Sequence, residues 1–184
     1  MTIIVAFKDP QTQAIHYGSD TRVTENDGDI CPPSEKFVHV GKRWAVGLSG
    51  SMRNLTIMKY GHGKMGDTDA MSIWEFSEAV REMISKCGVS NTDHTVPSYS
   101  ISMLMIDFFN RQIFEVATDF SIGQVHDEMA ARGSGYGFAL GCWFGIKDII
   151  GITGQEIVER CVGAAIKYEA QCGGEIVVYE SRPI

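Results

Sequence analysis

Short apolar runs separated by polar turns open the chain, and this pattern predicts strands. Residues 3–7 and 14–18 form one pair around the polar stretch 8–12, at the spacing of a β-hairpin. A second hairpin is predicted from residues 37–40 and 44–48, which flank Gly41-Lys42-Arg43. Glycine, proline and acidic residues gather at 25–35, so turns are expected there. The first fifty residues therefore predict mainly β structure.

Apolar positions at helical spacing come next. They predict helices over residues 51–60, capped by Ser51 and closed by Gly61, and over 71–87, closed by Gly88. Two antiparallel strands, 99–106 and 112–118, and a short strand near 123–126 are expected to follow. The rest of the chain predicts helices over 136–146 and 153–170, the second with a capping box at Thr153–Glu156, and a last strand over 175–179.

The order of these elements is strands, two helices, strands, two helices and a strand. Segregated runs of this kind favour an α+β fold over a doubly wound α/β fold. In strand 99–106, Ile101, Met103 and Met105 alternate with Ser102 and Leu104, so we expect both faces of its sheet to be covered. Two sheets between two layers of helices would bury every apolar face. With 184 residues, the chain is expected to form one domain, 1–184.

Composition narrows the function classes. The 16 basic and 23 acidic residues give a net charge of −7, which argues against nucleic-acid binding. No apolar run approaches the roughly 18 residues that cross a bilayer, and the amino terminus lacks a signal-peptide pattern, so we expect a cytoplasmic protein without a membrane segment. The five cysteines are widely spaced without a CxxC pair, which predicts neither a zinc site nor disulfides. Residues 132–137 do not complete a GxGxxG motif, so no cofactor is expected.

Three residues near the first strands carry candidate chemistry. Removal of Met1 would leave Thr2 with a hydroxyl and a free α-amine, which titrates near ~7.7–8.0 and can activate the weak hydroxyl nucleophile. Asp20, after the second predicted strand, could orient such an amine. Lys36 opens the third strand, and an inward-pointing lysine there would have a lowered pKa and favour an alkoxide. Each residue also has a purely structural interpretation: the start of an edge strand, a solvated turn and an edge lysine.

Two glycine-rich junctions are further candidates. Ser49-Gly50-Ser51 and Gly133-Ser134-Gly135 each lie between a strand and a predicted helix. Backbone N–H groups at a helix start can bind a developing oxyanion, and glycine permits close approach. Ordinary helix caps would have the same composition, so neither segment is specific alone.

Taken in order, these segments resemble a known family. Six of them follow the order found in proteasome β subunits and in the peptidase subunit of the bacterial two-component ATP-dependent protease: Met-Thr-Ile-Ile-Val at 1–5, Gly-Ser-Asp-Thr-Arg-Val-Thr at 18–24, Ser-Glu-Lys-Phe at 34–37, Leu-Ser-Gly-Ser at 48–51, Gly-Ser-Gly-Tyr at 133–136 and Cys-Gly-Gly at 172–174. The resemblance spans about residues 2–180, although 60–130 contributes little. These proteins are N-terminal nucleophile hydrolases, so the resemblance implies a four-layer αββα sandwich, in agreement with the element order.

The resemblance also implies a role for each matched residue. Thr2 would be the nucleophile and its amine the general base. Lys36 would lower the pKa of the Thr2 group, and Asp20 would hold Lys36 and the amine in place. The remaining implied roles are a loop contact for Arg22, a hydrogen bond to the amine and proton transfer for Ser134, and donation to the oxyanion by the Gly50 N–H. The implied reaction is transfer of an acyl group to Thr2, followed by hydrolysis.

The implied assembly is a homo-oligomeric ring that encloses its active sites. Unfolded polypeptides or peptides would be the substrates, with an ATPase or cap as a candidate partner. Trp74, Trp143 and Phe144 are candidates for subunit interfaces, with core packing as an equal alternative.

Two positions depart from the stricter family pattern. Proteasomal subunits usually have an aspartate, two residues, then serine and glycine before the last strand, where this chain has Glu169-Ala170-Gln171-Cys172-Gly173. Glutamate is one methylene longer, and a thiol is a poorer hydrogen-bond donor than a hydroxyl. These departures, together with Met1, keep open a catalytically inactive ring or scaffold subunit of the same fold. A more distant alternative is an α+β binding module with a ligand loop at 133–137.

Overall fold

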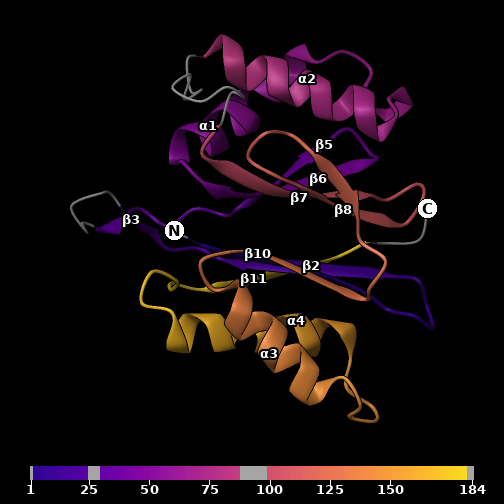
Figure 1. Cartoon of the computed structure of the whole chain (residues 1–184), viewed down its shortest axis with the longest axis vertical. Helices are drawn as coiled ribbons and strands as arrows, with labels where there is room; N and C mark the ends of the chain where they lie inside the picture. The colour runs from indigo at the N-terminus through magenta and orange to yellow at the C-terminus, as the bar shows by residue number, and fades with distance from the viewer. Residues whose placement is uncertain (1, 25–29, 88–98, 182–184) are drawn as a thin grey trace.

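The chain folds into four layers (Figure 1). A computed structural model describes residues 2–24, 30–87 and 99–181. Two antiparallel sheets face each other, and a pair of helices covers the outer face of each sheet. The α+β fold and the two sheets between two helix layers are therefore confirmed.

The first sheet has the strand order β10-β1-β2-β11. Its members are β10 (Met129–Gly133), β1 (Ile3–Lys8), β2 (Ile15–Asp20) and β11 (Ile176–Glu180). Side chains alternate between the faces of a strand, so Ile3 and Val5 pack toward the helices while Ile4 and Ala6 pack between the sheets. β1 is central and buried on both faces, so Thr2, the residue before it, is also buried.

The second sheet has the order β5-β6-β7-β8-β9. Its members are β5 (Phe37–Val40), β6 (Trp44–Gly50), β7 (Ile101–Asp107), β8 (Gln112–Val116) and β9 (Ile122–Gln124). Met103 and Met105 of β7 face the helices, and Leu104 and Ile106 face the other sheet. Both faces of β7 are therefore covered, as its alternating sequence predicts.

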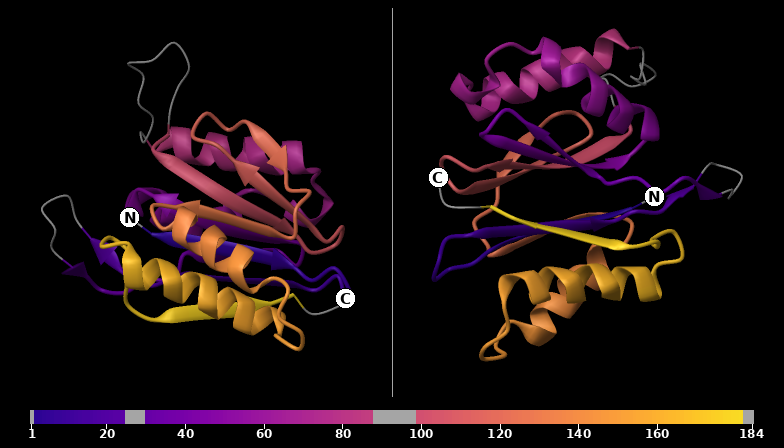
Figure 2. Two further views of the ribbon diagram at one scale, coloured as in Figure 1. Left: turned by 60° about the horizontal axis from the view of Figure 1, so that its bottom comes forward. Right: turned by 180° about the vertical axis from the view of Figure 1, so that it is seen from behind.

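Helices α1 (Met52–Gly61) and α2 (Ile73–Lys86) cover the second sheet, and α3 (Tyr136–Ile146) and α4 (Gly154–Tyr168) cover the first (Figure 2). Two short 3-10 helices, His62–Lys64 and Thr68–Ala70, join α1 to α2. The predicted N-terminal caps form: Ser51 accepts the Arg53 N–H, and Thr153 and Glu156 make a reciprocal capping box. Gly61, predicted to close the first helix, is instead the last residue of α1, and Gly88 lies outside the described residues. Among the described residues, no helix has the length and apolar character needed to cross a membrane.

Three local features differ from the sequence prediction. β2 continues to Asp20, which is fully buried, so the interpretation of this segment as a solvated turn is wrong. The turn-rich region contains a small ribbon of β3 (Val23–Thr24) and β4 (Ile30–Cys31), while residues 25–29 lie outside the described residues. β10 has no strand pattern of its own, because its Met-Ala-Ala-Arg-Gly sequence becomes a strand through pairing with β1.

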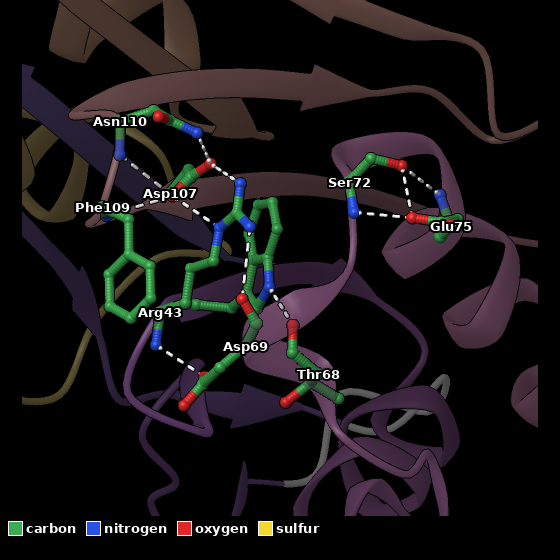
Figure 3. A network of polar contacts seen from close by, with 9 residues as sticks. Arg43, Thr68, Asp69, Ser72, Glu75, Asp107, Phe109 and Asn110 are labelled. Atoms are coloured by element: carbon green, nitrogen blue, oxygen red, sulfur yellow. Dashed lines mark hydrogen bonds and ion pairs between the residues drawn. The ribbon is translucent and has the colours of Figure 1, made fainter.

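A polar network fastens one end of the second sheet (Figure 3). The Arg43 guanidinium donates to both carboxylate oxygens of Asp107, at 3.0 and 2.7 Å, and Asn110 donates to the same carboxylate. The Trp44 indole N–H donates to the Thr68 carbonyl at 2.8 Å. These contacts lie at the Trp44 end of β6, whereas Gly50 is at its opposite end. The network therefore rigidifies the sandwich away from the candidate site.

Candidate active site

Thr2 and Asp20 meet where β1 begins and β2 ends. The Thr2 hydroxyl donates to Asp20 Oδ1, and the Ile3 N–H donates to the same oxygen at 3.1 Å. The Gly173 N–H donates to the other oxygen, Asp20 Oδ2, at 3.0 Å. Thr2 is 3% exposed and Asp20 0%. Antiparallel pairing of β1, β2 and β11 brings these three segments together, so the sheet register itself builds the contact.

Lys36 enters the same region from the residue before β5. Its side chain is buried and its ammonium donates to the Arg22 carbonyl oxygen at 2.9 Å, so the edge-lysine interpretation is wrong. Burial lowers the pKa of Lys36, and the nearby charge of Asp20 partly opposes that effect. Both residues belong to the described chain, in which no hydrogen bond joins them. Asp20 therefore acts on Lys36 through its charge and on Thr2 through direct contact.

Arg22 holds the loop that follows α4. Its guanidinium donates to the Ala170 carbonyl at 3.0 Å, and its backbone N–H donates to the Gly173 carbonyl at 2.9 Å. Glu169 ends α4 and accepts the Gln171 N–H at 3.2 Å. Arg22 thus contacts the loop that follows α4, while Glu169 lies at the start of that loop.

The side chains of Cys172 and Ser134 lie next to each other. Ser134 Oγ lies 3.8 Å from Cys172 Sγ. The thiol is 1% exposed, and burial raises the pKa of Cys172 to about 11. Cys172 therefore stays protonated near neutral pH, and it can either donate a weak hydrogen bond to Ser134 Oγ or accept one from it.

Two glycines at strand ends, Gly133 and Gly50, have positive φ and close backbone contacts. Gly133 has φ +107°, and a Cβ there would lie 2.0 Å from the Thr2 carbonyl oxygen and 3.1 Å from Ser49 Oγ. Gly50 has φ +122°, and a Cβ there would lie 2.2 Å from the Ser100 carbonyl oxygen. L-residues with a side chain rarely adopt such angles. The ends of β6 and β10 thus meet beside Thr2, which brings Gly50 and Ser134 to the same region.

The structure also adds residues that the sequence analysis does not single out. From the sequence, Gly133 is only part of a predicted helix start, because its contact with Thr2 depends on the β1–β10 pairing. Lys59 of α1 donates to Ser34 Oγ at 2.8 Å and lies close enough to influence Lys36. Nothing in the sequence of this helix predicts that Lys59 contacts Ser34 and lies near Lys36.

The chemistry of the cluster is that of a buried hydroxyl beside a carboxylate and an amine. In residues 2–24, 30–87 and 99–181, no group of three or more His, Cys, Asp or Glu side chains could hold a metal ion. The side chains present can orient a hydroxyl, place a positive charge beside it and offer backbone N–H groups from glycine-containing turns.

The fold of this chain is similar to that of several solved structures. No family model and no curated protein sequence matches the chain. BPH from Thiobacillus denitrificans is similar in structure, with a TM-score of 0.82 and 19% identity over 100% of this chain and 99% of its own. The same protein in complex with epoxomicin has a TM-score of 0.80 and 18% identity, with 100% of both chains covered. The chain has a proteasome-like N-terminal nucleophile hydrolase fold.

A third structure extends the comparison to another organism. HslV from Trypanosoma brucei has a TM-score of 0.71 and 17% identity, over 97% of this chain and 98% of its own. The proteasome-like fold thus covers nearly the whole chain. Among the described residues it includes 60–87 and 99–130, where the sequence resemblance is weakest.

Proposed function

We propose that the chain is a threonine-type N-terminal nucleophile peptidase that becomes active once Met1 is removed. The observation that carries this proposal is the buried Thr2 hydroxyl bonded to Asp20, with the buried Lys36 ammonium held on the neighbouring Arg22 carbonyl. Such an arrangement is costly for packing alone, because a buried carboxylate and a buried ammonium both lose hydration. The loss of hydration is explained if the two charges serve to activate the Thr2 hydroxyl.

The reaction follows from the groups around Thr2. As Thr2 Oγ attacks the peptide carbonyl carbon, its proton passes to the free α-amine, directly or through Ser134. The Lys36 charge stabilises the forming alkoxide, and the Gly50 N–H donates to the carbonyl oxygen as it becomes negative. The amine then gives its proton to the leaving nitrogen, which breaks the peptide bond and leaves an ester on Thr2. Water, deprotonated by the same amine, hydrolyses that ester.

The proposal includes assembly into a homo-oligomeric ring that encloses the active sites. It is supported by large side chains that one copy of the chain leaves exposed, since Trp74 is 63% and Phe144 73% exposed. Trp143, in contrast, is half-buried and packs on the core residue Phe7, with ring centroids 5.1 Å apart. Unfolded polypeptides would enter the ring in the cytoplasm with the help of an ATPase or cap. A light-scattering mass near the 20.3 kDa of one chain would contradict a stable ring.

The second candidate is an inactive ring or scaffold subunit of the same fold. It is favoured by Glu169 and by Cys172, whose protonated thiol stands where the stricter pattern has serine. Within the described residues, neither side chain hydrogen-bonds to Thr2 or Asp20, and for that reason we favour the peptidase.

Intact mass spectrometry with a threonine-reactive inhibitor tests the proposal. The purified chain is incubated with epoxomicin, the compound bound in one of the similar structures, or with a β-lactone. We expect loss of Met1 and one adduct per chain, mapped to Thr2. Thr2→Ala should give no adduct and no peptide turnover while the assembly survives. Retained turnover in Thr2→Ala would exclude Thr2 as nucleophile, and retained Met1 without an adduct would favour the inactive subunit.

A further inference from the structure

A second lysine stands beside the candidate nucleophilic site. Lys59 lies on α1, and its half-buried side chain donates a hydrogen bond to Ser34 Oγ at 2.8 Å. The Ser34 backbone N–H donates in turn to the Thr21 carbonyl at 2.9 Å, next to Asp20. The ammonium of Lys59 is therefore anchored to the segment that leads into Lys36. In Figures 1 and 2, α1 lies toward the same end of the sandwich as β3, which begins two residues after Thr21.

Helix α1 begins next to Gly50, the candidate oxyanion donor. The helix starts at Met52, two residues after Gly50, and positions 52, 56 and 59 share one face. Long side chains on a helix lean back toward its N-terminus, which for α1 is the end next to Gly50. A substrate side chain next to a carbonyl bound at Gly50 would run along this face.

The charge of Lys59 has no counterion in the described chain. Within residues 2–24, 30–87 and 99–181, the ion pairs involve Arg43, Arg81, Lys86 and Arg132, and none involves Lys59. Ser34 occupies one of the three N–H donors of its ammonium and is neutral. The nearest buried carboxylate, Asp20, already accepts hydrogen bonds from Thr2, Ile3 and Gly173.

Lys36 shows that the two ammonium groups interact. After burial and the opposing charge of Asp20, the charge of Lys59 is the next influence on the pKa of Lys36, and it lowers that pKa. Cys172 also faces Lys36 and acts in the opposite direction. Two like charges that act on each other, opposed by the one carboxylate of Asp20, leave a net positive site for an incoming anion.

We infer that Lys59 is a specificity-determining residue that binds the carboxylate of an acidic substrate side chain, so that the chain cleaves after glutamate or aspartate. This inference rests on the proposed peptidase function and names its substrate class. The acidic side chain would pair with Lys59 in a half-buried setting, where an ion pair is screened less than at the surface. Basic side chains would be repelled by both lysines.

Three fluorogenic peptides that differ only in the residue before the scissile bond, Glu, Leu or Lys, test the inference. The assembled, mature protein should give the highest kcat/KM with the Glu peptide. Lys59→Met should lower kcat/KM for the Glu peptide by about 10- to 100-fold, the range of a lost charge-assisted hydrogen bond, with little change for the Leu peptide. Lys59→Glu should favour the Lys peptide. Lys64→Met, which removes an exposed lysine just beyond α1, should leave all three rates unchanged.

The outcomes separate the two proposals. If Thr2 is labelled by epoxomicin and peptides are cleaved, but Lys59→Met leaves the Glu-to-Leu ratio unchanged, the inference is wrong and the peptidase function stands. An equal loss on all three peptides in Lys59→Met would also overturn it, because that is the signature of a structural role. If neither labelling nor cleavage occurs in the wild type, both proposals fail.

Discussion

Asp20→Asn tests whether the buried carboxylate organises the site. Asp20 accepts three hydrogen bonds from Thr2, Ile3 and Gly173 through its two oxygens. An asparagine of the same shape has one accepting oxygen and one donating NH2 group. If the oxygen faces Thr2 and Ile3, the NH2 group meets the Gly173 N–H; if it faces Gly173, the Ile3 N–H is left unpaired.

The size of the effect follows from this count. One buried backbone N–H without a partner costs about 1–3 kcal/mol, and replacing charge-assisted bonds by neutral ones adds about 1 kcal/mol. The expected loss of stability is therefore about 2–4 kcal/mol, which lowers the melting temperature of a chain of this size by roughly 4–16 °C. Since a displacement of the reacting atoms by about 1 Å can cost about 100-fold in rate, kcat/KM should fall by about that factor or more.

Calorimetry and peptide turnover, at one protein concentration, provide the assay. Asp107→Asn is the matched control, because Asp107 is equally buried but bonds to Arg43 at the other end of the second sheet. It should lose stability and keep the turnover rate of its folded fraction. The reasoning would be refuted if Asp20→Asn melted within about 1 °C of the wild type, or if both variants lost turnover equally.

Three further predictions concern charge and backbone geometry. The rate should rise with pH as the amine of mature Thr2 loses its proton near ~7.7–8.0. At higher pH it should fall again, and this fall should begin before pH 10.5, because burial lowers the pKa of Lys36 from that value and the Lys36 charge is needed. Gly133→Ala should lose about 1–3 kcal/mol and most turnover, since its Cβ would overlap the Thr2 carbonyl oxygen at φ +107°. Burial raises the pKa of Asp107, but hydrogen bonds from Arg43 and Asn110, together with the charge of Arg43, outweigh this and hold the pKa below 3.8. The stability gap between wild type and Asp107→Asn should therefore be full above pH 3.8 and shrink as pH falls below it.

Each of these has its own check. A pH–rate profile, with circular dichroism to confirm folding, addresses Lys36, and a rate that still climbs above pH 10.5 would show that its charge is not required. Urea unfolding of Gly133→Ala is compared with Gly137→Ala, an exposed helical glycine with open space around it, which should not be destabilised. Urea unfolding of Asp107→Asn at several pH values should show the shrinking gap, and a constant gap would contradict the ion-pair explanation.

Local sequence patterns predicted most of the elements because their signals are local. Helix α3 has the predicted bounds, and α4 begins with the predicted capping box. The covered faces of β7 follow from alternation alone. β10 could not be found in this way, since it becomes a strand only through pairing with β1, and the ribbon of β3 and β4 is two residues long on each side.

The candidate residues of the site, from Thr2 to Cys172, could be proposed from the order of short motifs in the sequence. The chain carries the hydroxyl, the carboxylate and the amine at 2, 20 and 36, and those identities are a property of the sequence alone. What only the tertiary structure decided is their relation: Asp20 bonds to Thr2 and not to Lys36, Gly133 packs against the Thr2 carbonyl, and Lys59 stands beside Lys36 without an ion pair in the described chain. The physical reason is that hydrogen bonds and charge interactions act over a few ångströms in space. Sheet pairing between segments more than a hundred residues apart sets those distances, as the contact of β1 with β10 shows.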